Sequence, residues 1–263
     1  MTRAIKASIT FGLVYIPVSL SSCIKNNDIS FHLIDKKTMS RIKYLKTCSE
    51  CEGKIVDSKN IVKGFEYEKG KYVIIDDVDF KKLQTKKDKN IIIEQFVNLK
   101  EIDPIFFDKS FYVTPEGGEK AFNLLVKALE EEKKVGIAKM ILNNKEYLVS
   151  LRTKDKGIIL NTLFFSNQIQ KNPFIPTKEI PNAKEIKLAK AIISDMSEKF
   201  DISKFKDTYK EQLMSVIEKK ISGKKIVKAK EKNTPKINNL LDALQASIKA
   251  SEKRKKSSYN KQA

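Results

Sequence analysis

The spacing of the apolar residues changes along the chain, and the change falls near Pro181. Before that point, apolar residues alternate with polar ones or form short runs rich in Ile and Val, a pattern typical of β-strands. After Pro181 they recur every three or four residues, as on an amphipathic helix. Strands followed by helices favour a β-barrel or sandwich with a helical C-terminal extension. The predicted fold class is therefore mixed α+β.

The expected strands begin at the N-terminus, where Ile5, Ala7, Ile9 and Phe11 share one face of a half-buried strand. Pro17 lies in the next extended segment and favours a sheet edge or a bulge there, because proline has no N–H to donate. Further strands are expected over residues 71–77, 90–97 and 104–113, followed by a three-strand meander over 137–165 that turns at 143–144 and 153–157.

One helix is expected over residues 118–134, with Phe122, Leu125, Val126 and Leu129 on one face and glycines flanking it at Gly117 and Gly136. The region 182–222 carries two apolar stripes, formed by Ile186, Ala189, Ile193, Met196 and Phe200, and then by Tyr209, Leu213, Val216, Ile217 and Ile221. A shorter amphipathic segment covers 236–250. It is too short to be a stable helix alone, so it is a plausible docking peptide for a partner. Its apolar face is formed by Ile237, Leu240, Leu241, Leu244 and Ile248.

Lysine and arginine outnumber the acidic residues by 52 to 33, which gives a formal net charge of +19. Residues 221–263 hold twelve of these cations and three acids, so a folded body is followed by a basic, flexible tail over 223–263. Such a surplus indicates a polyanion partner, nucleic acid first and an acidic membrane surface second; a generally solubilising surface is the alternative. No apolar run is long enough for a transmembrane helix. The three cysteines suggest a reducing cytoplasm.

The sequence does not indicate an enzyme. It has no glycine-rich phosphate-binding loop, and its single histidine, His32, excludes most histidine-based catalytic arrangements. Residues 154–157, Lys-Asp-Lys-Gly, superficially resemble a nucleotidyltransferase lysine motif, but are expected to form a hairpin turn. The acidic pairs Asp76/Asp77 and Asp103/Asp108 could in principle hold Mg²⁺, but solvated loop carboxylates are the simpler interpretation.

The ordered series of segments resembles bacterial Ku. It runs "IKASITFGLVYIPVSL", "ISFHLIDKKTMSRIKYLKTCSEC", "IVKGFEYEKGKYVIIDD", "EIDPIFFDKSFYVTPEGGEKAF", "KVGIAKMILNNKEYLVSLR", "FDISKFKDTYKEQLMSVIEKKISGK" and "INNLLDALQASIKA". The resemblance covers residues 3 to about 250. It implies a Ku-type core barrel over 1–181 with an extended DNA-encircling bridge at about 25–85, a helical C-terminal arm over 182–222, and a basic tail.

The resemblance also implies a function. A homodimeric ring would thread onto double-stranded DNA ends, protect them, and recruit and stimulate the ATP-dependent DNA ligase LigD in double-strand break repair by non-homologous end joining. The expected location is the cytoplasm, at the nucleoid. Two alternatives remain open: a general chromosomal or RNA-binding protein, which would bind circular DNA as well as linear DNA, and a nuclease that uses the loop carboxylates and requires Mg²⁺.

Sequence-independent binding requires phosphate contacts from lysine and arginine. Arg41 and Lys43 alternate with apolar residues, so a strand there would put both cations on one face; with Lys46 they are the leading candidates. The alternative is a solvated strand face. The further DNA-binding candidates are Lys36, Lys37, Lys54 and Lys63 in the bridge, and Lys224, Lys225, Lys228, Lys253, Arg254, Lys255 and Lys256 in the tail.

Cys48 and Cys51 form a C-x-x-C pair within the proposed bridge, but a structural zinc site needs four ligands. Related proteins often carry glycine directly after this pair, whereas here Glu52 takes that place and Gly53 follows. The pair is interpreted first as a vestige or a plain tight turn, so no cofactor is expected. Zinc is the second hypothesis, completed by His32, by a carboxylate, or by the same pair of a second subunit. His32 itself is expected to be a core residue. Redox chemistry is the third hypothesis, and the lack of a following helix opposes it.

Overall fold

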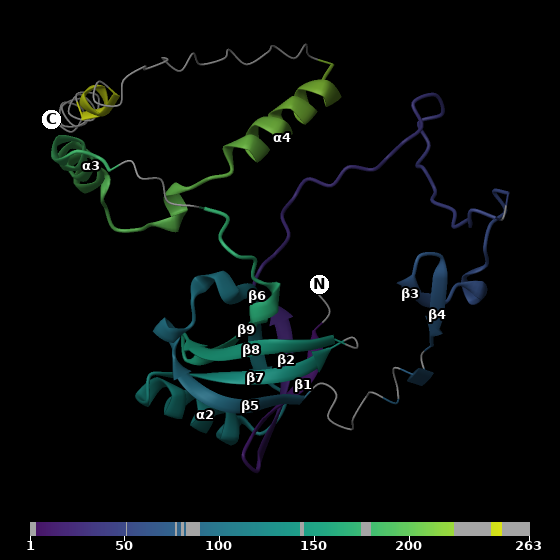
Figure 1. Cartoon of the computed structure of the whole chain (residues 1–263), viewed down its shortest axis with the longest axis horizontal. Coiled ribbons are helices and arrows are strands. Elements are labelled where there is room, and N and C mark those ends of the chain that lie inside the picture. The colour runs from purple at the N-terminus through teal and green to yellow at the C-terminus, as the bar shows by residue number, and fades with distance from the viewer. Residues whose placement is uncertain are drawn as a thin grey trace. The chain divides into compact units, whose positions relative to one another are not determined.

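Seven strands form a closed barrel in the computed structural model, in the order β1-β2-β6-β9-β8-β7-β5 (Figure 1). All neighbouring pairs are antiparallel except β1 and β5, which are parallel and close the barrel. The strands are β1 (Ile5–Phe11), β2 (Val14–Ser22), β5 (Asn90–Asn98), β6 (Phe107–Pro115), β7 (Lys134–Leu142), β8 (Lys145–Lys154) and β9 (Gly157–Leu163). The predicted fold class, a mixed α+β protein built on a barrel, is confirmed.

The structure describes residues 4–50, 52–76, 78–79, 82, 90–142, 145–174, 180–223 and 243–248. The chain divides into two compact units, Met1–Asn172 and Pro173–Ala263. The sequence places this boundary slightly later, at residue 181.

The barrel interior is the hydrophobic core of the first unit. Ile9, Ile16 and Leu160 are fully buried within it, and the alternation expected for β1 is confirmed because Ile5, Ala7 and Phe11 also pack on this core. The helix α2 (Glu119–Glu131) adds one buried face to the same core, made of Phe122, Leu125, Val126 and Leu129 as predicted. Burial of these side chains is the main source of the barrel's stability.

Turn chemistry sets the connections of the barrel. The β8–β9 turn consists of Asp155 and Lys156, both with positive φ, so the 154–157 segment is a tight hairpin turn as expected. Pro17 lies just before β2 begins to pair with β6 at Val18, so its missing N–H costs no ladder hydrogen bond on that side. Up to Pro17, β2 is therefore an edge strand that pairs with β1 alone, as expected. From Val18 onward it pairs with both β1 and β6.

Three sequence expectations need correction. Residues 104–106 form a short 3-10 helix, η3 (Pro104–Phe106), before β6, because Asp103 accepts a hydrogen bond from the backbone N–H of Ile105 and caps it. Gly136 does not flank α2 but lies inside β7, where it packs against the side chains of Ile93 and Phe96 of β5. The strand expected over 71–77 ends at Ile75.

The second unit contains α3 (Ala183–Met196) and α4 (Thr208–Ile221). Asn182 and Glu185 cap α3 reciprocally through hydrogen bonds of 3.0 and 2.9 Å. The first apolar stripe was expected to reach Phe200, but the helix ends at Met196; the ring of Phe200 instead stacks on Phe205, with centroids 5.9 Å apart. Among the described residues, no helix is both long and apolar enough to cross a membrane.

Candidate nucleic-acid interface

The chain leaves the barrel after β2 and returns at β5, and we call the intervening residues 23–89 the excursion (Figure 1). Both of its ends are fixed in the sheet on either side of β1, because Leu20 pairs with Ile5 and Asn90 pairs with Ser8. The Ser8 hydroxyl donates a hydrogen bond to the Asn90 side chain at the point of return. The excursion is therefore a long loop whose two ends lie at the same end of the barrel.

Local hydrogen bonds, and not a core, order the first part of the excursion. The backbone N–H of Ile42 donates to Leu33 at 3.0 Å, and Ile34 and Arg41 form an isolated antiparallel pair, so residues 33–42 make a small hairpin. Asp35 caps its turn by accepting a hydrogen bond from the Thr38 backbone N–H at 2.8 Å. Hydrogen bonds from Thr38 hold the pKa of the Asp35 carboxyl below its ordinary value.

The second part of the excursion contains a short 3-10 helix, η1 (Ser58–Asn60), and a two-stranded sheet of β3 (Lys63–Glu68) and β4 (Lys71–Ile75). This sheet is separate from the barrel. The β4 strand follows the sequence prediction, whereas β3 was not predicted, because its sequence KGFEYE alternates only briefly and carries a glycine at its second position.

The bridge cations predicted to contact DNA are all exposed. Within the part of the chain that the structure describes, no ion pair involves Lys36, Lys37, Arg41, Lys43, Lys46 or Lys54. The strand expected over residues 41–44 is absent: Arg41 forms its single pair with Ile34, and Lys43 lies in irregular chain. Regular alternation therefore does not place Arg41 and Lys43 on one face.

Exposed apolar side chains accompany these cations. Tyr44 is 80% exposed and Phe65 is 65% exposed, although neither position is near a chain end. Residues of this kind run through the whole described excursion: Ile24, Phe31, Leu33, Ile34, Met39, Ile42, Tyr44, Leu45, Ile55, Ile61, Val62, Phe65, Tyr67, Tyr72, Val73, Ile74 and Val78. So many exposed apolar groups on one segment are unusual for a surface that faces only solvent.

The C-x-x-C pair lies in a loop that a backbone hydrogen bond closes, from the N–H of Val56 to the carbonyl of Lys46 at 2.8 Å. Turns occupy residues 49–50 and 52–53, and both Glu52 and Gly53 have positive φ. Cys48 is disulfide-bonded, and Cys51 lies outside the described residues. A thiol held in a disulfide is not a zinc ligand, because zinc binds the thiolate.

His32 is exposed, which corrects its expected place in the core. Its flanking apolar residues Phe31 and Leu33 are exposed as well, so the apolar run that suggested burial is part of the excursion surface. Across the described residues, no group of three or more His, Cys, Asp or Glu side chains is arranged to hold a metal ion. The donors described in one chain therefore do not make up a four-ligand zinc site.

The loop carboxylates considered for Mg²⁺ make local hydrogen bonds. Asp76 accepts from the backbone N–H groups of Val78 and Asp79, and Asp103 caps η3. Asp77 lies outside the described residues. This arrangement gives the carboxylates a structural role in their turns.

Several candidates fall on the C-terminal tail. Residues 243–248 are helical, and Leu244 and Ile248 are half-buried there. Outside the described residues lie the remaining docking candidates Ile237, Leu240 and Leu241, and the tail cations Lys224, Lys225, Lys228, Lys253, Arg254, Lys255 and Lys256.

Fold and surface together define a class of protein: a closed barrel that presents a long, basic, doubly anchored arm. The chain belongs to the Ku family, because residues 10–189 match the model of the Ku70/Ku80 beta-barrel domain. Curated relatives include proteins named "Non-homologous end joining protein Ku" from Lachnoclostridium phytofermentans, Archaeoglobus fulgidus and Bacillus subtilis. They are 42%, 41% and 37% identical, over 95%, 93% and 92% of this chain and 97%, 97% and 80% of their own lengths.

Proposed function

We propose that this protein binds the ends of double-stranded DNA without sequence preference, as a homodimeric ring, in double-strand break repair by non-homologous end joining. The proposed role is not enzymatic: the protein protects the ends and recruits and stimulates the ATP-dependent ligase LigD. It would act in the cytoplasm, at the nucleoid. The names of the relatives support the pathway, and the basic excursion supports the binding mode.

The observation that carries the proposal is the excursion with both ends anchored at the barrel. Residues 36–63 hold eight Lys and Arg against three Asp and Glu, and their side chains are exposed. Exposed cations of this kind suit phosphate contacts, which position a protein on DNA but carry no sequence information. A loop closed at the barrel also suits a protein that surrounds the duplex instead of reading one groove.

End-dependence tests this function directly. A gel shift at about 150 mM salt compares one DNA as a closed relaxed circle and as the same molecule linearised, since salt weakens simple phosphate binding strongly. We expect binding to the linear form alone. Equal binding to both forms would contradict the ring and leave a general DNA-coating protein, and Mg²⁺-dependent cleavage of either form would favour a nuclease.

Homodimerisation is supported by the apolar side chains exposed along the excursion, because a second copy would cover them. Sedimentation velocity of the full chain should show a dimer. Replacing Phe65 and Ile74 in the β3–β4 sheet by serine should raise the dissociation constant at least tenfold. Leu13→Ser is the matched control, since Leu13 is 104% exposed in the β1–β2 turn, outside the excursion. If Leu13→Ser raised the dissociation constant as much as the double variant, the excursion would not be the dimer contact.

Ligase recruitment is assigned to the tail segment 236–250. Truncation after Gly223 should preserve end-binding and abolish stimulation of the purified ligase. In the full chain, Leu244→Glu should act like the truncation. Ser247→Glu adds the same charge to an exposed position of the same helix and should leave stimulation of the ligase unchanged. Stimulation that survives the truncation would refute this role.

Zinc has no part in the proposed mechanism. The remaining zinc hypothesis is an ion shared by the Cys48/Cys51 pairs of two subunits, and it requires that the disulfide at Cys48 is first reduced. Elemental analysis of the purified dimer decides it, because a shared site requires one zinc per two chains.

A further inference from the structure

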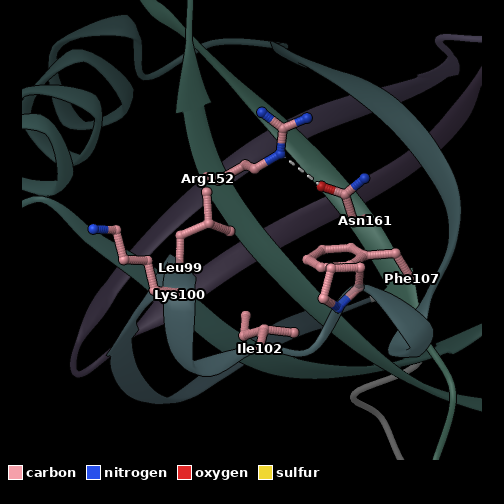
Figure 2. Close-up of a pocket in the computed structure, with 7 residues that line it drawn as sticks. Leu99, Lys100, Ile102, Phe107, Arg152 and Asn161 are labelled. Atoms are coloured by element: carbon pink, nitrogen blue, oxygen red, sulfur yellow. Dashed lines mark hydrogen bonds between the residues drawn. The ribbon is translucent and has the colours of Figure 1, made fainter. Parts of the chain in front are cut away.

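A pocket of about 530 Å³ lies on the outer face of the barrel, over β8 and β9 (Figure 2). Its apolar side is formed by Leu99, Ile102, Pro104 and Phe107, from the connection between β5 and β6 and from the start of β6. Arg152 and Asn161 form its polar side, and Lys100 completes the lining. The pocket thus offers an apolar surface directly beside a guanidinium group.

Hydrogen bonds fix the position of that guanidinium group. The Nε of Arg152 donates to the Oδ1 of Asn161 at 3.0 Å, and the Nδ2 of Asn161 donates to the Oγ of Ser110 at 2.7 Å. Asn161 is 5% exposed, so the chain of bonds is anchored in the barrel wall. Figure 2 shows the two terminal nitrogens of Arg152 pointing away from Asn161. They form the planar fork that binds a carboxylate through two hydrogen bonds.

Arg152 makes no ion pair with any carboxylate of the described residues, although it is half-buried. The acidic residues next in sequence to the lining residues bond elsewhere: Glu101 accepts from Asn98, Asp103 caps η3, and Asp108 accepts from Thr162. A partly desolvated cation without a counter-charge is costly. Charge complementarity therefore calls for an anion from outside this part of the chain.

The apolar side of the pocket is preformed. The short 3-10 helices η2 (Leu99–Glu101) and η3 hold Leu99, Ile102 and Pro104 in place, and the Nζ of Lys134 donates to Asn98 at 3.1 Å beside them. Ile102 and Phe107 are half-buried. A DNA phosphate would leave these side chains uncovered, whereas an apolar side chain next to a carboxylate would occupy both halves of the pocket.

We propose that this pocket is a docking site for a partner polypeptide that presents Leu, Ile, Phe or Trp within two residues of Asp or Glu. The apolar side chain packs on Ile102 and Phe107, and the carboxylate pairs with the free fork of Arg152. The site goes beyond DNA-end binding, does not depend on it, and is distinct from the tail segment assigned to the ligase.

The first test is a selection of random seven-residue peptides displayed on phage, against the full chain without DNA. Because a protein of charge +19 attracts acidic peptides in general, the selection is repeated on Arg152→Gln and on Lys156→Gln, which removes the same charge at the β8–β9 turn. We expect peptides with the paired apolar and acidic residues from the native chain and from Lys156→Gln, and their loss with Arg152→Gln. Recovery of the same peptides by all three proteins, or of no such pair, would overturn the proposal.

A titration completes the test with the best selected peptide and its Asp→Asn or Glu→Gln analogue. The acidic form should bind the native chain at least tenfold more tightly than the amide form, and Arg152→Gln should remove that difference. Ile102→Ser should weaken the binding of both peptide forms. It also provides a second variant if Arg152→Gln does not fold. Displacement of the peptide by single-stranded oligo-dT, with the same dependence on Arg152, would assign the pocket to DNA and refute the peptide site.

Discussion

In the barrel, Ile9 and Leu160 are fully buried, whereas in the excursion the comparable side chains of Ile42 and Leu45 are 46% and 65% exposed. The barrel strands are paired around a closed sheet, while the described residues in the first half of the excursion have a single isolated bridge pair. The same residue types therefore have different energetic roles in the two regions. In the barrel they stabilise the fold, and in the excursion they are available to a partner.

This contrast separates folding from function along one chain. The barrel needs no contribution from the excursion to bury its core, so the excursion is free to carry exposed cations and apolar groups. Its own order comes from turns, such as the one that Asp35 caps, and from the two-stranded β3–β4 sheet. Substitutions in the excursion should therefore change binding more than the stability of the fold.

The largest expected difference is in the free energy of unfolding, when the same substitution, Leu to Ala, is made in each region. Leu151 in β8 is fully buried and Leu45 in the excursion is 65% exposed. Leu151→Ala should lower the free energy of unfolding by about 2–5 kcal/mol, because it removes core contacts and leaves a cavity. Leu45→Ala should change it by less than about 0.5 kcal/mol at protein concentrations where the chain is monomeric. Urea unfolding followed by circular dichroism measures both, and equal losses would mean that the excursion shares the barrel's core.

The next effect concerns charge. Replacing Arg41, Lys43 and Lys46 by glutamine should weaken binding to linear DNA roughly 100-fold near 150 mM salt, since each lost phosphate contact releases about 0.9 fewer counterions. The slope of log affinity against log salt should fall by up to about 2.7.

A control variant removes the same charge from the barrel unit. Lys120, Lys127 and Lys156 are exposed on α2 and on the β8–β9 turn. Their replacement by glutamine should leave the salt slope nearly unchanged. Equal slopes for the two triple variants would show that net charge, and not the excursion, controls DNA binding.

The smallest effect is local and depends on pH. Because the pKa of Asp35 is below its ordinary value, its carboxylate stabilises the 35–40 turn fully above that ordinary value, and the stabilisation is lost as pH falls through the lowered pKa. Asp35→Ala should remove this dependence. Amide exchange at Thr38 and Ser40 measures it, while unfolding of the barrel should be unaffected. A large change in barrel stability would contradict the separation of the two regions.

Local patterns in the sequence predicted much of this structure. The alternation of β1 and the face of α2 follow from neighbouring residues, and both are confirmed. The turn at Asp155 and Lys156 was predicted for the same reason. Closure of the barrel by the parallel pairing of β1 and β5 joins residues far apart in the chain, so no local pattern contains it.

The candidate site was less predictable. The sequence shows where the bridge lysines lie, but it predicted neither the exposure of His32 nor the absence of a strand at 41–44. The pattern of alternating apolar residues is the same whether those residues face a core or an exposed surface. Arg152 could not be found from sequence alone. Its importance comes from Asn161 and Ser110, which lie on two other strands.

The placement of the excursion between β2 and β5 also has a consequence for synthesis. The β1–β2 hairpin leaves the ribosome before its partners β5 and β6, which begin at Asn90 and Phe107. At about 5–20 residues per second, the hairpin waits roughly 3–14 s for β5, and longer for the closing strands. During that time Ile9, Ile16 and Val18 have no core to enter. The nascent β1–β2 hairpin is therefore expected to expose apolar side chains that a chaperone could cover.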